Sequence, residues 1–102
     1  FTALMIAAQE GHERVVELLL WHGAEVNLQS SNGVTALMCA ACFNFPAIMR
    51  RLLRAGADTA ARTVIGKTAL QLAKEKGHAA CVEAFRQHVT EVTKAGRREG
   101  AT

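Results

Sequence analysis

The feature that most constrains the fold of this chain is the regular spacing of its glycines. Six of the eight glycines recur at a spacing of 33 or 66 residues, a register that we call the lattice. They are the pairs Gly23 with Gly56, Gly33 with Gly66, and Gly11 with Gly77. Asn44 stands midway between the members of the last pair. An internal period of this length indicates stacked supersecondary units. The 102 residues therefore hold about three such units.

The same period runs through the residues expected to form helices. A Thr-Ala-Leu triplet occurs three times, beginning at Thr2, Thr35 and Thr68. A Thr hydroxyl can accept a hydrogen bond from a free backbone N–H at the start of a helix. The glycine or asparagine of the lattice follows nine residues after the Thr, and these residues tolerate the left-handed conformation that ends a helix. Each triplet is therefore predicted to open a short helix.

A second helix is expected in each unit. In the first unit its apolar residues recur with helical period, at Val15, Val16, Leu19 and Leu20. Gly23 ends this stripe, and about ten residues then lead to a turn at Asn32-Gly33. The pattern predicts helix, turn, helix and hairpin, three times over.

This unit resembles the ankyrin repeat. Residues 33–41 read Gly-Val-Thr-Ala-Leu-Met-Cys-Ala-Ala, and Gly11-His12 runs on to Leu19-Leu20 and Gly23-Ala24. The resemblance covers residues 1–89 and implies an all-α solenoid of three repeats with short β-hairpin fingers. The predicted units are an N-terminally truncated repeat at 1–33, a second at 34–66, a capping-like third at 67–96, and a flexible tail at 97–102. The last helix is expected to run on to Gly96.

The sequence departs from the family pattern at several positions. Met5, Met38 and Gln71 replace the usual His, so its hydrogen bonds are expected to be missing. Ser30 and Thr63 stand where finger Asp residues are common. We therefore expect softer hairpins but the same fold.

The chain offers little material for catalysis or metal binding. Cys39-Ala40-Ala41-Cys42 is a C-x-x-C motif, but the lattice places Cys39 in the core and Cys42 toward solvent or a groove. Zinc needs three or four converging ligands, and the sequence has no second cysteine pair. The four histidines fall on the lattice, and no carboxylate or nucleophile stands at a spacing that would place it beside them. We predict no enzyme activity, no cofactor and no metal, and the three cysteines indicate a reducing, intracellular setting.

Exposed apolar residues are the better functional signal. Phe43 is equivalent to Glu10 and Lys76, and Val64 and Ile65 occupy a finger tip where polar residues are usual. Adjacent exposed apolar residues indicate an interaction site. The family resemblance implies that finger tips and inner-helix ends line a concave groove. The candidate partner-binding residues are Phe43, Val64, Ile65, Cys42, Lys67, Arg62, Glu75, Lys76, Asn32 and Val34.

The predicted partner is another protein or peptide of acidic character, bound by a monomeric, non-catalytic interaction module. No apolar run is long enough to span a membrane. Trp21 is equivalent to Arg54 and Gln87, and the sequence leaves open whether it faces solvent or packs over a neighbouring helix end. Phe45 is expected to be half-buried.

Charge is distributed unevenly along the chain. Residues 1–33 carry one basic and four acidic residues (net −3), residues 34–66 carry four and one (net +3), and the remainder carries seven and four (net +3). The alternative function is therefore nucleic-acid or anionic-surface binding through Arg50, Arg51, Arg54, Arg97 and Arg98. A nucleic-acid site would need a basic stripe with interleaved aromatics, which this cluster lacks, so a solvated convex face is the preferred interpretation.

Overall fold

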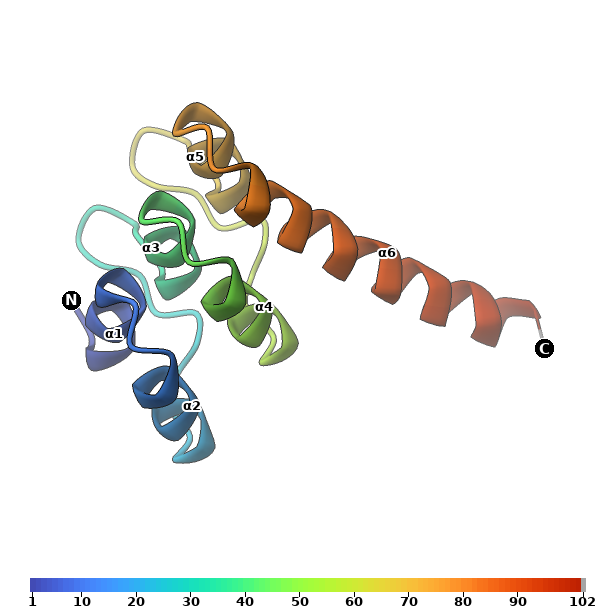
Figure 1. Ribbon diagram of the computed structural model, residues 1–102, viewed down its shortest axis with the longest axis horizontal. Helices are drawn as coiled ribbons and strands as arrows, with labels where there is room; N and C mark the ends of the chain where they lie inside the picture. Colours follow the sequence, from blue (N-terminus) through green and yellow to red (C-terminus); the bar gives the residue numbers. More distant parts are fainter. Residues whose placement is uncertain (102) are drawn as a thin grey trace.

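Six helices form two layers in the computed structural model, which describes the backbone of residues 1–101 and the side chains of residues 1–93. The helices are α1 (Ala3–Glu10), α2 (Glu13–Trp21), α3 (Ala36–Cys42), α4 (Pro46–Arg54), α5 (Ala69–Glu75) and α6 (Ala79–Ala101). Helices α1, α3 and α5 form the inner layer, and α2, α4 and the start of α6 form the outer layer (Figure 1). The predicted all-α solenoid is confirmed.

The three predicted threonine caps are present at the inner helices. Thr2, Thr35 and Thr68 each accept the backbone N–H three residues later, at 3.1, 3.3 and 3.3 Å. In the third repeat, the Gln71 side chain returns a bond, because its Oε1 accepts the Thr68 N–H at 2.9 Å. Gln71 therefore closes a capping box.

The lattice residues take the backbone conformation that the sequence predicted for them. All six lattice glycines have positive φ, and Asn44 is the non-glycine residue that shares it within residues 1–101, with φ of 64°. At Gly33 a Cβ atom would lie 3.0 Å from both the Arg62 carbonyl oxygen and the Thr63 Cα. The period in the sequence therefore marks places where the chain must turn left-handed, and at Gly33 also where two fingers meet.

The fingers differ from the prediction in one respect: none of the residues described by the structure forms a β-strand. Each finger is closed by a short loop instead. The Ser30 N–H donates to the Val34 carbonyl at 2.8 Å, and the Thr63 N–H donates to the Lys67 carbonyl at 2.9 Å. The Ser30 and Thr63 hydroxyls accept the Val34 and Lys67 N–H groups in return. Too few residues pair for a strand, and the hydroxyls occupy the place of the family's aspartates.

The core lies between the two layers and between successive repeats. Its largest fully buried side chains are Met5, Leu37, Met38, Ile48, Met49, Leu52, Val16 and Cys81. Cys39 and Cys81 are buried, as the lattice predicted. Phe45 is half-buried, also as predicted, and its ring occupies the space that a Cβ atom on Gly11 would need.

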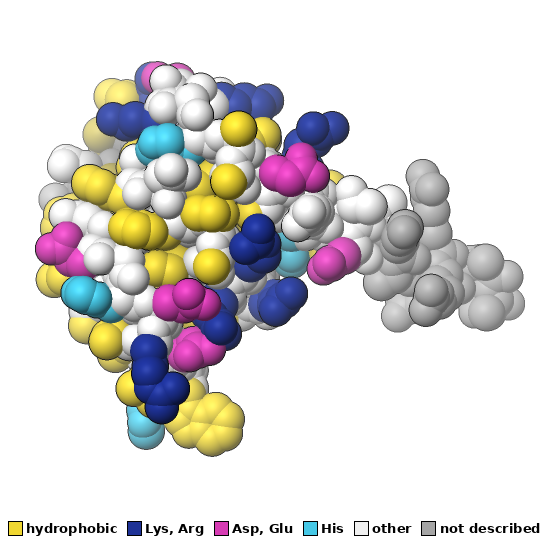
Figure 2. All heavy atoms as spheres, in the orientation of Figure 1, with side chains coloured by type: hydrophobic (Ala, Val, Ile, Leu, Met, Phe, Trp, Pro, Cys, Tyr) yellow, Lys and Arg dark blue, Asp and Glu magenta, His cyan; other side chains and the backbone are white. Residues whose placement is uncertain are grey.

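Ion pairs join the acidic first repeat to the basic second repeat. Arg51 on α4 contacts two carboxylates of α2, with Nε 2.8 Å from Glu13 and Nη1 paired with Glu17. Acidic and basic side chains lie next to each other on this face of the outer layer (Figure 2). The hydrogen bond that the Arg51 Nε–H donates to the Glu13 carboxylate raises the pKa of Arg51 above its usual value. One member of the predicted basic cluster is therefore neutralised within the chain.

Helix α6 is longer than the sequence suggested. It runs to Ala101, beyond the predicted end at Gly96, and projects away from the stack (Figure 1). No proline follows Pro46 in the sequence, and a glycine weakens a helix by only about 1 kcal/mol. The predicted flexible tail at 97–102 thus continues the helix as far as Ala101, while its side chains lie outside the described residues. None of the described helices combines the length and hydropathy needed to cross a membrane.

Candidate partner-binding groove

An apolar groove of about 310 Å³ lies where the inner helices meet the fingers. Apolar atoms make up almost all of its lining. The residues around it come from all three repeats and are Phe1, Gln9, Val34, Met38, Cys39, Cys42, Phe43, Thr63 and Leu72. We call this surface the concave groove. Its size is at the lower end of the range for ligand sites, about 300–1,000 Å³.

Three predicted site residues come together in the concave groove. Phe43 is the C-cap of α3, where its N–H donates to the Cys39 carbonyl at 3.1 Å. Because the next residue, Asn44, turns the chain left-handed, Phe43 stays at the helix end, and 53% of its surface is exposed. Cys42 and Val34 are half-buried beside it. The prediction that Phe43 is exposed is therefore confirmed.

The finger-tip residues lie outside the lining of the concave groove. Val64 and Ile65 form a turn and are 72% and 74% exposed. The Val64 N–H donates to the Asn32 carbonyl at 2.9 Å, so the two finger tips lie side by side. Only Thr63 of this finger reaches the groove. Val64, Ile65 and Asn32 thus form a separate exposed surface on the fingers.

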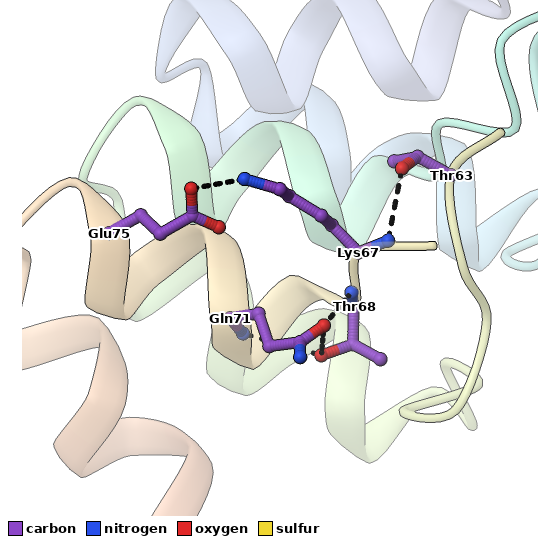
Figure 3. Close-up of polar contacts among 5 residues, drawn as sticks. All are labelled: Thr63, Lys67, Thr68, Gln71 and Glu75. Atoms are coloured by element: carbon purple, nitrogen blue, oxygen red, sulfur yellow. Dashed lines mark hydrogen bonds and ion pairs between the residues drawn. The ribbon is translucent and has the colours of Figure 1, made fainter. Parts of the chain in front are cut away.

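Two of the predicted basic residues are engaged within the chain. Lys67 Nζ pairs with Glu75, and the Lys67 N–H donates to Thr63 Oγ1 at 3.2 Å (Figure 3). Arg62 Nη1 donates to the Gly66 carbonyl at 2.8 Å and so stabilises its own finger. These contacts reduce what Lys67 and Arg62 can offer to a partner.

Lys76 is the predicted cation that remains available. It is the C-cap of α5, it is exposed, and among the described side chains it forms no ion pair. Its charge lowers the pKa of the Cys42 thiol, while the neighbouring Glu75 raises it. Both charges therefore act on Cys42, a lining residue of the concave groove, although neither side chain is itself part of the lining.

The two groove thiols are poor nucleophiles. Burial, with a smaller effect of Cys42, raises the pKa of Cys39 to about 11. Burial is also the main reason why the pKa of Cys42 is raised. Both groups are thus protonated near pH 7, and both cysteines are free. Across the described residues no three His, Cys, Asp or Glu side chains converge as metal ligands.

Sequence reasoning missed several residues of the groove lining, including Phe1, Gln9, Met38 and Leu72. A signal was available for two of them. Leu72 is the lattice equivalent of Cys39, and Gln9 is the equivalent of Cys42, so the same register that gave Cys42 could have given both. Met38 stands at the position of the family's usual His, which favoured a purely structural interpretation. Phe1 carried no lattice signal of its own.

The described arginines of the alternative basic site differ in their contacts. Arg50 and Arg54 are exposed on α4, whereas Arg51 is paired with α2. Arg97 and Arg98 belong to the side chains outside the described residues. The sequence left open whether Trp21 faces solvent or packs over a neighbouring helix end. Its side chain faces solvent, because the residue is 83% exposed.

The fold agrees with comparisons against known proteins. Residues 4–95 match the family "Ankyrin repeats (3 copies)". The chain is 40% identical over 80 residues to the E3 ubiquitin-protein ligase XBAT33 of Arabidopsis thaliana, covering 78% of this chain and 16% of that protein. It is 42% identical over 79 residues to the human ankyrin repeat and KH domain-containing protein 1, covering 76% of this chain and 3% of that protein. The crystal structure of the human ASB11 ankyrin repeat domain superposes with a TM-score of 0.82 at 33% identity, covering 86% of this chain and 40% of that chain.

The chain therefore belongs to the ankyrin repeat family. Ankyrin repeats are protein–protein interaction modules, and the fold is generally non-catalytic. The chain spans only a small part of the two curated relatives named above.

Proposed function

We propose that this chain is a non-catalytic interaction module that binds a segment of a partner protein in the concave groove, acting as a monomer. The observation that carries the proposal is an exposed aromatic side chain, Phe43, at the rim of an apolar groove of about 310 Å³. Aromatic anchors next to desolvated surface dominate the energy of protein interfaces.

The chemistry of the groove defines the segment that fits it. The apolar lining favours an aliphatic or aromatic side chain, which would bury itself against Phe43, Met38 and Leu72. Lys76, whose charge acts on the lining residue Cys42, favours an acidic residue beside that anchor. Because helices and capped turns fix the lining residues, little conformational entropy is lost on binding. The three free cysteines suit a reducing, intracellular compartment.

A peptide display selection tests this proposal. Peptides are selected on the wild-type chain, and their affinities are then measured for Phe43→Ala and for a control, Trp21→Ala. The control removes an even more exposed aromatic from the end of α2, outside the groove. Phe43→Ala should weaken binding by at least about 1–2 kcal/mol, while the Tm stays nearly unchanged because the side chain is half exposed.

The two variants together make the result decisive. Equal affinity for Phe43→Ala and wild type would remove the concave groove from the proposal. Loss of binding in Trp21→Ala alone would move the site to the outer layer. Binding lost in Phe43→Ala and kept in Trp21→Ala supports the proposal, and a further loss in Lys76→Ala would assign the acidic preference.

A further inference from the structure

A small hollow lies between α4 and α6, in the outer layer and away from the concave groove. Its volume is about 40 Å³, and the residues around it are Arg50, Arg54, Ala84, Gln87, His88 and Glu91. A water molecule needs roughly 10–15 Å³ of such space, so the hollow has room for a small polar group of a few atoms. It is far smaller than a site for a drug-sized molecule.

The equivalent place one repeat earlier, between α2 and α4, is built differently. Glu17 stands there at the position of Arg50, and its carboxylate pairs with Arg51 across the two helices. Between α4 and α6 the position equivalent to Arg51 is Ala84, whose side chain is almost fully buried. The short side chain of Ala84 leaves space. Arg50 stands where the earlier repeat has the paired Glu17, and it forms no ion pair with any described side chain.

The hollow therefore carries an excess of positive charge. Arg50 and Arg54 are one helical turn apart on α4, a spacing at which like charges repel. Glu91 also lines the hollow, but it forms no ion pair with Arg50, Arg54 or His88, all of which have described side chains. Figure 2 shows Lys or Arg side chains gathered around a histidine where α6 leaves the stack.

The hydrogen-bond donors of the hollow suit one shape of anion. Each guanidinium offers five N–H donors, the Gln87 amide offers two, and the His88 ring offers at least one. They come from two helices and so approach from different directions. One guanidinium already satisfies a planar carboxylate through a bidentate pair. Donors from both sides match a tetrahedral oxyanion, whose oxygens point in several directions.

We propose that the hollow between α4 and α6 binds a phosphate group through Arg50, Arg54, Gln87 and His88. Inorganic phosphate and a phosphorylated side chain share this chemistry. The hollow is in the outer layer, whereas the concave groove is formed by the inner helices and the fingers (Figure 1). A phosphate bound here leaves the groove open, so the two proposals stand or fall separately.

An NMR titration of the whole chain with inorganic phosphate tests the proposal, at pH 7 and with the ionic strength held constant by sodium chloride. Backbone amides in the last turn of α4 and around Gln87 should shift and saturate. The double variant Arg50→Gln/Arg54→Gln should weaken phosphate binding at least 10-fold. Arg14→Gln is the matched control, because it removes an exposed cation from α2, away from the hollow, and its phosphate affinity should equal that of wild type.

Three results of the titration would overturn the phosphate proposal. Shifts that chloride reproduces, or that the double variant keeps while circular dichroism shows it folded, overturn the proposal. If the double variant unfolds, His88→Ala replaces it, and unchanged phosphate affinity in that variant overturns the proposal equally. Binding of a DNA duplex at low salt without saturable binding of phosphate also overturns it, because that pattern belongs to diffuse charge.

A second titration with N-acetyl-phosphoserine amide distinguishes the two sources of the phosphate group. At least 10-fold tighter binding than inorganic phosphate assigns a phosphorylated side chain, and equal affinity assigns free phosphate.

Discussion

The first and second repeats carry equivalent residues but bury them to very different degrees. Ile6 is 51% exposed, whereas Cys39, its equivalent in the second repeat, is 3% exposed. Val15 is 45% exposed, whereas its equivalent Ile48 is 2% exposed. The second repeat has a helix pair on each side, and within the described chain the first has one on a single side.

This difference shows that burial in a solenoid depends on the neighbouring repeat as much as on the residue itself. One repeat cannot cover its own apolar face, and the next repeat supplies the missing wall. Stability in such a stack is approximately a sum of repeat and interface contributions. Equivalent substitutions in the two repeats should therefore have unequal effects, and several experiments can test that expectation.

The largest difference is expected for the outer-helix core position. Ile48→Ala should lower the free energy of unfolding by about 2–5 kcal/mol, because it leaves a cavity between α4 and its neighbours. Val15→Ala should lower it by at most about 1 kcal/mol, since nearly half of that side chain is already in water. Urea denaturation of both variants measures the difference, and similar losses would contradict the comparison.

The finger turns should show a smaller difference of the same kind. Gly33→Ala should destabilise the chain by about 1–3 kcal/mol, because φ is 80° and the new Cβ would lie 3.0 Å from backbone atoms of the next finger. Gly66→Ala has a similar φ of 82° but open space around the new Cβ. Gly66→Ala should therefore suffer only the backbone strain, and its loss of stability should be smaller than that of Gly33→Ala. Thermal unfolding compares the two, and an equal fall in Tm would show that the contact between fingers is unimportant.

The helix caps should give an intermediate to small effect. Thr35→Ala should cost about 1 kcal/mol, since the Thr35 hydroxyl is buried and caps the central helix α3. Thr2→Ala removes the same cap at the less covered end of the stack, where water can reach the freed N–H groups. A smaller loss of unfolding free energy is expected there. Chemical denaturation that finds a larger loss of unfolding free energy for Thr2→Ala than for Thr35→Ala would contradict the expectation.

The last test changes reactivity and leaves the fold undisturbed. Burial raises the pKa of Cys39 from the ordinary 9.0 to about 11, so its thiolate is scarce at neutral pH, and its reaction with a thiol reagent should accelerate as the pH rises toward 11. Ile6→Cys places a thiol at the equivalent exposed position. At pH 8 it should react at least 10-fold faster than Cys39, and mass spectrometry of each modified site measures the two rates. Equal rates would mean that the two positions are equally accessible.

Much of the fold could be predicted because its signals are local and repeated. Asn44 could be assigned to a left-handed turn because its lattice partners are glycines, and Thr35 to a cap because it opens an apolar helix. Phe43 could be assigned to the surface because its equivalents are charged. Each of these inferences needs only the conformation of a few neighbouring residues and the register of the repeat.

Other features depend on side chains that meet only after the repeats stack. The sequence placed Arg51 in a basic cluster with Arg50 and Arg54, but packing pairs Arg51 with carboxylates of α2. Lys67 was a candidate partner-binding residue, but the fold brings it to Glu75. Such contacts turn on the distance and direction between helices, which no single-repeat pattern encodes.

The sequence by itself determined the number of repeats, the caps and left-handed turns of each one, and the exposed position of Phe43. These properties follow from local backbone preferences and from a register of 33 residues that repeats along the chain. Only the tertiary structure decided which equivalent residues are buried, which charges are paired, and where a groove and a hollow remain. Those outcomes follow from the packing of neighbouring helices, where one exchange, such as Ala84 at the position of Arg51, converts an ion pair into an open space.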